Sequence, residues 1–167
     1  MHGAKRRRAP TEFGGQLMEK QRMRVSYGLR EAQLSEIVAK AMKKKGAAVG
    51  DSIIERIERQ FANVVFRLGF ASSRTIARQL ILHGHFFVNK KKIRAPFYSL
   101  KVGETVSIIP NSKELLIFKD LSNKLKKYDA PEWLFLDKEK LEGGLLALPK
   151  GVELPFDINL VVDYYSK

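Results

Sequence analysis

The fold of this chain is decided by residues 67–93, which read RLGFASSRTIARQLILHGHFFVNKKKI. Up to Gly84 the apolar residues recur every three or four positions, which predicts a helix with Ser72 or Ser73 as its cap and Gly84 as its stop. Three apolar residues then precede Asn89 and three lysines, a pattern that predicts a short strand followed by a turn. A helix followed by a strand and a tight turn is typical of a small α+β domain.

The residues before this stretch predict another helix, and those after it a second strand. Residues 53–68 carry one apolar face, made by Ile53, Ile57, Phe61, Val64, Val65 and Leu68. The opposite face, which we expect to point outward, holds Arg56, Arg59, Gln60, Asn63 and Arg67. Ser52 with Glu55 fits a capping box, and Gly69 a helix stop. Residues 104–109 are rich in β-branched residues and predict the second strand.

The flanking segments complete an α+β architecture with two domains. Residues 17–45 predict helices interrupted at Gly28, and residues 111–130 predict an amphipathic helix. WLFLD, GGLLALP and INLVVDYY are short apolar runs that predict strands extending the sheet, with Gly143 and Gly144 as a loose turn. We therefore expect a basic N-terminal arm and helical domain over residues 1–50. Residues 51–167 would form a domain of helices packed on a small, mostly antiparallel sheet, with its central module at about 55–110 and a strand extension at 111–167.

The positive charge of the chain is concentrated in two blocks. The formal net charge is +13. Residues 1–30 contain eight basic and two acidic residues, residues 56–101 contain ten and one, and residues 111–167 contain nine and ten. Two basic blocks beside a neutral tail indicate two contacts with a polyanion. The apolar faces are needed for the cores, which argues against a membrane surface as that polyanion.

Several functional classes lack their sequence signals. The chain has no cysteine, which excludes disulfides and thiolate-bound metals. It has no apolar run long enough for a membrane span and no apolar stretch after its basic start that would indicate a secretory signal. Phosphate-binding loops, dinucleotide fingerprints and HExxH are absent too. We therefore expect neither an enzyme nor a bound cofactor or metal.

The candidate RNA-binding residues are cations, polar residues and one aromatic on the expected exposed faces. Residues 1–12 are expected to be disordered until a polyanion neutralises them. Three adjacent lysines at a strand turn concentrate charge beyond what a turn requires, and Tyr98 would stack on a base or pack in the core. The full set is Lys5, Arg6, Arg7, Arg8, Lys20, Arg22, Arg24, Arg59, Asn63, Arg67, Ser73, Arg74, Arg78, Gln79, His83, His85, Asn89, Lys90, Lys91, Lys92, Tyr98 and Lys101.

The motif within residues 67–93 resembles the S-four RNA-binding domain. It consists of Ser73, Arg74, Ala77, Arg78, Gln79, Leu80, His83, Gly84, Val88 and Asn89. The flanks extend the resemblance over essentially the whole chain, to the S-four family of small-subunit ribosomal proteins. These flanks are MHGAKRRRAPTEFGGQLMEKQRMRVSYGL, in which Phe13 replaces a tyrosine, and the segments PEWLFLDKEKLEGGLLALP and DINLVVDYYSK. Members of this family usually begin further upstream, so the resemblance implies a naturally short N terminus or a truncation.

The resemblance implies a structural, non-enzymatic protein of the small ribosomal subunit. It implies that the chain holds a junction in the 5′ domain of 16S-type rRNA, acts early in assembly, and contributes to decoding accuracy and messenger entry. Implied partners are this rRNA, messenger RNA and neighbouring proteins including ribosomal protein S-five, on a cytoplasmic bacterial or an organellar ribosome. The alternative is a free-standing or targeting S-four-domain protein, such as an RNA chaperone or RNA-modification factor.

Overall fold

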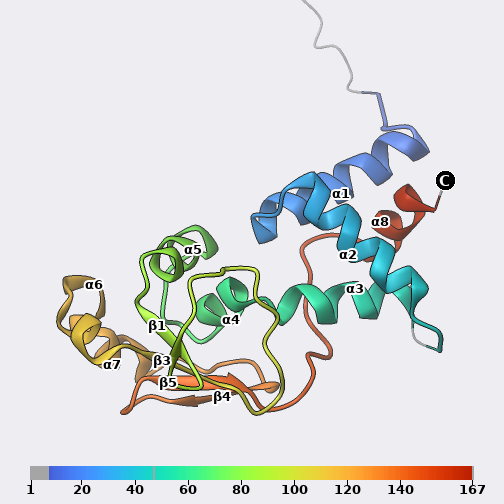
Figure 1. Ribbon diagram of the computed structural model, residues 1–167. Helices are drawn as coiled ribbons and strands as arrows, with labels where there is room; N and C mark the ends of the chain where they lie inside the picture. The colour runs from blue at the N-terminus through green and yellow to red at the C-terminus, as the bar shows by residue number, and fades with distance from the viewer. Residues whose placement is uncertain (1–7, 47, 167) are drawn as a thin grey trace, which may run out of the picture. The chain divides into compact units, whose positions relative to one another are not determined.

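The computed structural model describes residues 8–46 and 48–166, which form two compact units (Figure 1). The first unit contains the described residues up to Gly50 and those from Glu153 onward, and the second is Asp51–Val152. Helices and a five-stranded antiparallel sheet confirm the α+β fold. Every helix in the described part of the chain is too short or too polar to cross a lipid bilayer.

The first unit is helical. It contains α1 (Glu12–Tyr27), α2 (Glu31–Lys43) and α8 (Ile158–Tyr165). Thr11 caps α1 by accepting the Gly14 amide at 3.0 Å, and Gly28 ends it with a φ of 65°, as the glycine break predicts. The buried apolar residues of this unit include Met23, Tyr27, Leu29, Leu34, Val38, Ala41, Phe156 and Val161. Helix α8 lies against α1 and α2, so the end of the chain completes this helical core.

The prediction that INLVVDYY forms a strand is wrong, since these residues form α8. Asp157 is the N-cap, and its carboxylate accepts the Asn159 amide at 2.9 Å. β-Branched and aromatic residues favour strands mainly where a sheet edge is available to pair with them. Here the segment instead packs Val161 into a helical core, and the Tyr165 hydroxyl donates to Glu31 on α2 at 2.7 Å.

The second unit places helices over one antiparallel sheet in the order β2-β1-β3-β5-β4. Its helices are α3 (Val49–Glu58), which begins at the boundary between the units, α4 (Phe61–Arg67), α5 (Arg74–Leu82), η1 (Pro110–Glu114), α6 (Leu116–Lys119) and α7 (Leu121–Leu125). Its strands are β1 (Phe86–Val88), β2 (Lys91–Lys92), β3 (Thr105–Ile108), β4 (Leu134–Asp137) and β5 (Glu142–Leu145). The predicted strands at 86–88, at 104–109 and in WLFLD are thereby confirmed, and the one in GGLLALP is confirmed only up to Leu145, where β5 ends.

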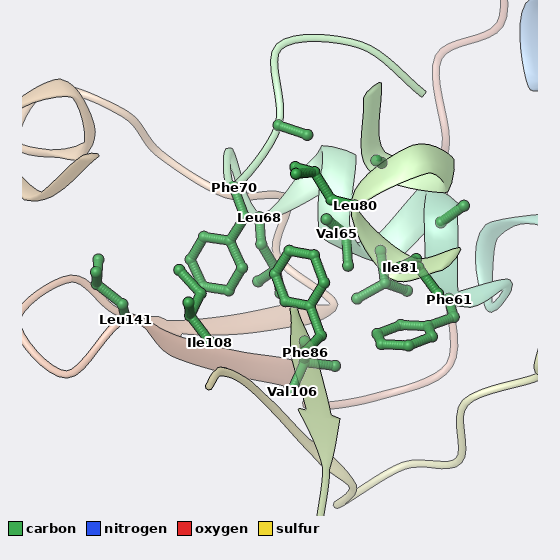
Figure 2. Packing of buried hydrophobic residues seen from close by; sticks show 14 of the residues in the cluster. Phe61, Val65, Leu68, Phe70, Leu80, Ile81, Phe86, Val106, Ile108 and Leu141 are labelled. Atoms are coloured by element: carbon green, nitrogen blue, oxygen red, sulfur yellow. The ribbon is translucent and has the colours of Figure 1, made fainter. Parts of the chain in front are cut away.

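The core of the second unit lies between α4, α5 and the sheet. Figure 2 shows the aromatic rings of Phe61, Phe70 and Phe86 at its centre, with Phe70 and Phe86 stacked at a centroid distance of 6.4 Å. Leu80 and Ile81 of α5 cover them, as the helical spacing predicts. This packing fixes the start of α5, where the candidate arginines lie.

The predicted helix over residues 53–68 is broken into α3 and α4. Gln60 has an extended backbone and forms an isolated bridge with Ser99, while the Phe61 amide donates to the Tyr98 carbonyl at 2.8 Å. The loop around residues 96–100 thus takes the amides that a continuous helix would use. The capping box at Ser52 is wrong as well, because α3 begins at Val49 and Ser52 is buried within it.

Gly143 and Gly144 do not form a loose turn but lie in β5, between β3 and β4. A Cβ on Gly143 would approach the Leu68 Cδ2 atom to 2.5 Å and the Phe135 carbonyl to 2.7 Å. A Cβ on Gly144 would collide with the Glu104 carbonyl oxygen. Glycine is needed here because other groups approach the strand too closely for any side chain.

The amphipathic helix predicted over residues 111–130 is also wrong. The segment consists of η1, α6 and α7, separated by extended or irregular backbone at Leu115 and Asp120. Only some of its apolar residues reach the core, among them Phe118, Leu121 and Leu125. Leu115, Leu116 and Ile117 are exposed.

Candidate nucleic-acid interface

The start of α5 presents the first candidate residues. Ser73, one of the two serines predicted as the cap, caps the helix, and its hydroxyl accepts the Ile76 amide at 3.1 Å. Arg74 follows at once, and Arg78 lies one turn further along and is half-buried. The Arg74 Nε donates to the Asn63 Oδ1 at 2.9 Å, and its guanidinium lies 4.6 Å from the Phe66 ring centroid. Arg74 is therefore held against α4 by a hydrogen bond and a cation–π contact.

Asn63 is in turn held by a buried carboxylate, that of Glu58. The Asn63 Nδ2 donates to the Glu58 Oε2 at 2.5 Å and to the Glu58 backbone carbonyl at 3.0 Å. Arg67 donates to the same carboxylate through Nε at 3.1 Å and Nη2 at 2.7 Å. The side chain of Glu58 has no exposed surface, whereas that of Arg67 is 24% exposed. A carboxylate in this position is tolerated because charge-assisted donors satisfy it.

These four side chains form one connected set, which we call the Glu58 network: Glu58, Asn63, Arg67 and Arg74. Its existence changes two predictions about the α4 face. Asn63 was expected to point outward but is 3% exposed, and Arg67 was expected on a solvated face but is paired with Glu58. The break after α3 is the cause, because it turns α4 so that Asn63 and Arg67 face back toward Glu58. Sequence reasoning missed Glu58; its one signal is that it is the single acid among residues 56–101.

The lysine turn lies at the edge of the sheet. Asn89 and Lys90 have φ values of 49° and 65° and make a two-residue hairpin turn between β1 and β2. The other two lysines, Lys91 and Lys92, form the exposed edge strand β2 rather than extending the turn. Asn89 has a structural contact, because its Oδ1 accepts the Thr105 amide at 2.9 Å. The three lysines are exposed and therefore remain candidates for RNA binding. The side-chain carbonyl of Asn89 already accepts a hydrogen bond within the protein.

The two histidines at the end of α5 differ in their surroundings. His83 and Gln79 are exposed, whereas His85 packs edge-on to Phe118 and its Nδ1 lies 2.8 Å from the Ser112 hydroxyl. Burial lowers the pKa of His85, and the nearby His83 and Lys92 lower it further. His85 is therefore more inclined to stay neutral at physiological pH than an ordinary histidine.

The loop of residues 94–101 contains two predicted residues, Tyr98 and Lys101, and contacts a third, Arg59; Arg59 and Tyr98 already have partners. The Arg59 Nε donates to the Leu100 carbonyl at 2.9 Å. The Tyr98 ring packs on the core and its hydroxyl donates to Glu104 at 2.9 Å; this hydrogen bond, with burial and the charge of Glu104, raises the pKa of Tyr98. Tyr98 is thus a packed residue, which leaves Lys101 as an exposed cation of this loop.

Arg94 is an exposed cation that sequence reasoning missed. A Cβ built on Gly84 would lie 2.9 Å from the Arg94 Nε, so the guanidinium covers the glycine turn between α5 and β1. This contact brings a loop cation to the turn at the end of α5. No local sequence pattern marks Arg94, because its position depends on where the loop returns to Gly84.

In the first unit the predicted cations are largely engaged with neighbours. Lys5, Arg6 and Arg7 lie outside the described residues, and Arg8 is exposed. Lys20 is only 4% exposed; its Nζ pairs with Glu31 at 2.8 Å and lies 4.8 Å from the Tyr164 ring centroid. Arg22 pairs with Glu19 at 3.1 Å, and Arg24 donates to Gln21 at 2.9 Å. Lys20 therefore has a role in the helical core that its charge did not predict.

Comparison with known proteins gives matches along nearly the whole chain. Residues 1–58 match the model of the ribosomal protein S4/S9 N-terminal domain, and residues 61–106 match that of the S4 domain. The small ribosomal subunit protein uS4 of Syntrophomonas wolfei is 41% identical over 99% of this chain and 80% of its own length. The proteins of the same name from Roseiflexus castenholzii and Aquifex aeolicus are 42% and 39% identical, each over 99% of this chain and 82% of their own length.

Proposed function

The chain belongs to the family of the small ribosomal subunit protein uS4, and from this premise we propose that it holds a junction in the 5′ domain of 16S-type rRNA. Members of this family are structural, non-enzymatic ribosomal proteins, so the chain is a constituent of the small subunit that binds rRNA. The S-four resemblance seen in the sequence is thereby confirmed.

The observation that carries the proposal is the Glu58 network at the start of α5. Multi-helix RNA is recognised mostly through its phosphates and its shape, which requires guanidinium groups held in fixed positions. Asn63 fixes Arg74 through its Nε, and Glu58 fixes Arg67 through a two-point contact. Because these side chains are ordered before RNA arrives, less conformational entropy is lost on binding.

The remaining candidate residues would extend this contact in both units. On the second unit these are exposed or partly exposed residues, namely Arg78, Gln79, His83, Lys90, Lys91, Lys92, Arg94 and Lys101. On the first unit they are Arg8, Arg22 and Arg24, with Lys5, Arg6 and Arg7 of the basic arm. A contact by each unit fits the two basic blocks of the sequence.

The proposal includes an early role in assembly, a contribution to decoding accuracy, and a position near messenger entry beside ribosomal protein S-five. Its support is family membership together with the charge distribution. Residues 111–167 contain nine basic and ten acidic residues. This balance of charge suits contact with protein better than contact with RNA. The three relatives named above come from bacteria, which favours a ribosome of bacterial type.

A competition experiment tests the rRNA proposal. The full chain is titrated with the isolated 5′ domain of 16S-type rRNA, against unrelated folded RNA of equal length, at several salt concentrations. Affinity should fall by roughly one log unit per log unit of salt for each phosphate contacted. A preference for the 5′ domain that persists at moderate salt supports the proposal, whereas equal affinity for both RNAs overturns it.

Charge reversal locates the contact. The double variant Arg74→Glu, Arg78→Glu should lose about 3 kcal/mol of binding free energy, because two charge-assisted contacts are replaced by repulsion. Lys150→Glu, at an exposed site in the neutral tail, is the matched control and should bind nearly as the parent does. If the double variant binds the 5′ domain as tightly as the Lys150→Glu control does, the start of α5 does not contact the rRNA.

A further inference from the structure

An exposed apolar surface lies at α6. Leu115, Leu116 and Ile117 follow one another in the chain and are 40%, 89% and 44% exposed. Figure 1 shows α6 and α7 at one end of the second unit. Isolated exposed leucines are common on proteins, but three large aliphatic side chains exposed at consecutive positions are of the kind that marks interaction sites. We call these three residues the α6 patch.

The exposure of the α6 patch is not caused by incomplete packing of the core, because other residues of the same segment occupy the core positions. The residue that follows it, Phe118, is 2% exposed and contacts Phe86 edge-on at a centroid distance of 5.9 Å. Leu121 and Leu125 fill the remaining positions under this segment. The extended backbone of Leu115, with φ −65° and ψ 143°, separates η1 from α6. The core positions of this segment are thus filled, and the three aliphatic side chains are left outside.

The surroundings of the α6 patch are rich in lysine. Residues 113–127 contain five lysines and two acids. Lys119 lies on α6 one turn after Leu116, and both side chains are exposed. Lys113 reaches across to Lys140, with its Nζ 3.3 Å from the Lys140 carbonyl oxygen. The patch therefore lies in a segment of net positive charge, in which Glu114 and Asp120 flank it as closely in sequence as Lys113 and Lys119 do.

We propose that the α6 patch is a docking surface for a segment of another protein that presents apolar side chains bordered by Asp and Glu. Apolar contact at the patch would supply the attraction, and the net positive charge of residues 113–127 would select an acidic partner. RNA is the poorer match, because aliphatic side chains neither pair with phosphates nor stack on bases as aromatic and guanidinium groups do. Docking here does not require rRNA binding, so this proposal and the proposed function can fail separately.

Two designed peptides test the proposal on the full chain. Both are amphipathic helices with Leu and Ile on one face; one carries Glu and the other Lys on the opposite face. The acidic peptide should bind saturably and shift the methyl NMR signals of Leu116 and Ile117, and the basic peptide should bind at least tenfold more weakly. Leu116→Ser should weaken the acidic peptide at least tenfold without lowering the melting temperature, since Leu116 is 89% exposed.

Val25→Ser is the matched control, because Val25 is an exposed aliphatic residue on α1, 69% exposed and distant in sequence. It should leave the affinity for the acidic peptide unchanged. The proposal is overturned if the acidic peptide does not bind, if both peptides bind equally, or if Val25→Ser weakens binding as much as Leu116→Ser. Tighter binding of vesicles containing anionic lipid than of the peptide would also overturn it.

A photo-cross-linker at position 116 tests the same surface in assembled small subunits. The cross-link should map to one segment of one protein, with apolar residues and an excess of Asp and Glu. Cross-links to rRNA, or to many unrelated segments, would overturn the proposal.

Discussion

The carboxylate of Glu58 accepts two hydrogen bonds from the guanidinium of Arg67, at 2.7 and 3.1 Å, although the two residues are nine positions apart and lie on different helices. The break at Gln60 makes this contact possible, because it redirects α4 relative to α3. The same carboxylate holds Asn63, which holds Arg74. A single acid in a basic segment thus organises the side chains expected to meet RNA.

Removing the charge of Glu58 should destabilise the fold. Glu58→Gln leaves the guanidinium of Arg67 without its countercharge, and breaking a buried pair of this kind costs about 3 kcal/mol at the lower end of its usual range, since Arg67 is 24% exposed. Urea unfolding measures the loss. Glu55→Gln is the control: its pair with Arg59 is longer, at 3.5 Å, so the cost should stay within about 1 kcal/mol. Equal losses in the two variants would contradict the role given to Glu58.

Asn63→Ala should weaken rRNA binding even though Asn63 is 3% exposed. Without the Asn63 Oδ1, the guanidinium of Arg74 loses its fixed orientation, and we expect about 1 kcal/mol less binding free energy, measured by titration at a temperature where the variant is folded. Ser52→Ala, which also removes a buried polar group, should leave rRNA affinity intact. In a chain that already carries Arg74→Ala, Asn63→Ala should cause no further loss of rRNA affinity. If the losses of binding free energy in the two variants were fully additive, Asn63 would not act through Arg74.

Two glycine-to-alanine changes should act in opposite directions. Gly143→Ala forces a Cβ to within 2.5 Å of Leu68 and 2.7 Å of the Phe135 carbonyl, so we expect a loss of about 1–3 kcal/mol. A Cβ on Gly15, inside α1, meets no atom within 4 Å, so Gly15→Ala should stabilise its helix by roughly 0.5–1 kcal/mol. Thermal unfolding followed by circular dichroism compares the two. If Gly143→Ala did not change the stability, Leu68 and the neighbouring strand β4 would have to move away from β5 to make room for the added Cβ.

Acid should weaken the helical unit through Glu31. Burial raises the pKa of Glu31, but hydrogen bonds from Lys20 and Tyr165 outweigh it, and the net pKa lies below the usual 4.5. The unfolded chain therefore binds the proton more readily than the folded chain, so this stabilisation is present above about pH 4.5 and is lost as the pH falls through the lowered folded pKa.

Urea unfolding of the parent and of Glu31→Gln at several pH values between neutral and strongly acidic checks this. The parent should lose more stability on acidification than the variant does. Glu36→Gln is the comparison: the Glu36 side chain is 65% exposed and pairs with Lys40 at the surface of α2, so this substitution should change the response to acid less than Glu31→Gln does. If the parent and Glu31→Gln respond identically to acid, the contacts of Glu31 do not contribute to stability.

Local signals in the sequence were sufficient for several parts of the structure. The serine cap and glycine stop of α5 depend on neighbours within four residues, and so does the Asn89-Lys90 turn. The same holds for the helix end at Gly28. The S-four motif is built from these local elements, which is why the family could be identified from the sequence.

Predictions from local sequence were wrong where nonlocal contacts decide the structure. INLVVDYY has strand propensity, yet α8 forms because its partners are α1 and α2, more than a hundred residues away in the chain. Gly143 and Gly144 read as a turn, yet they are strand positions that Leu68 and Glu104 approach closely. Propensity and spacing describe a segment alone, whereas these outcomes depend on what the segment packs against.

The sequence by itself determined the family, the α+β class, the position of α5 with its arginines, and the two basic blocks. Only the tertiary structure decided which polar side chains are already engaged. Asn63, Arg67 and Lys20 all read as exposed RNA ligands, yet each has a partner brought to it by folding, Glu58 for the first two and Glu31 for Lys20. The physical reason is that a buried charge or amide must be paired, and the residue that pairs it is selected by the path of the backbone.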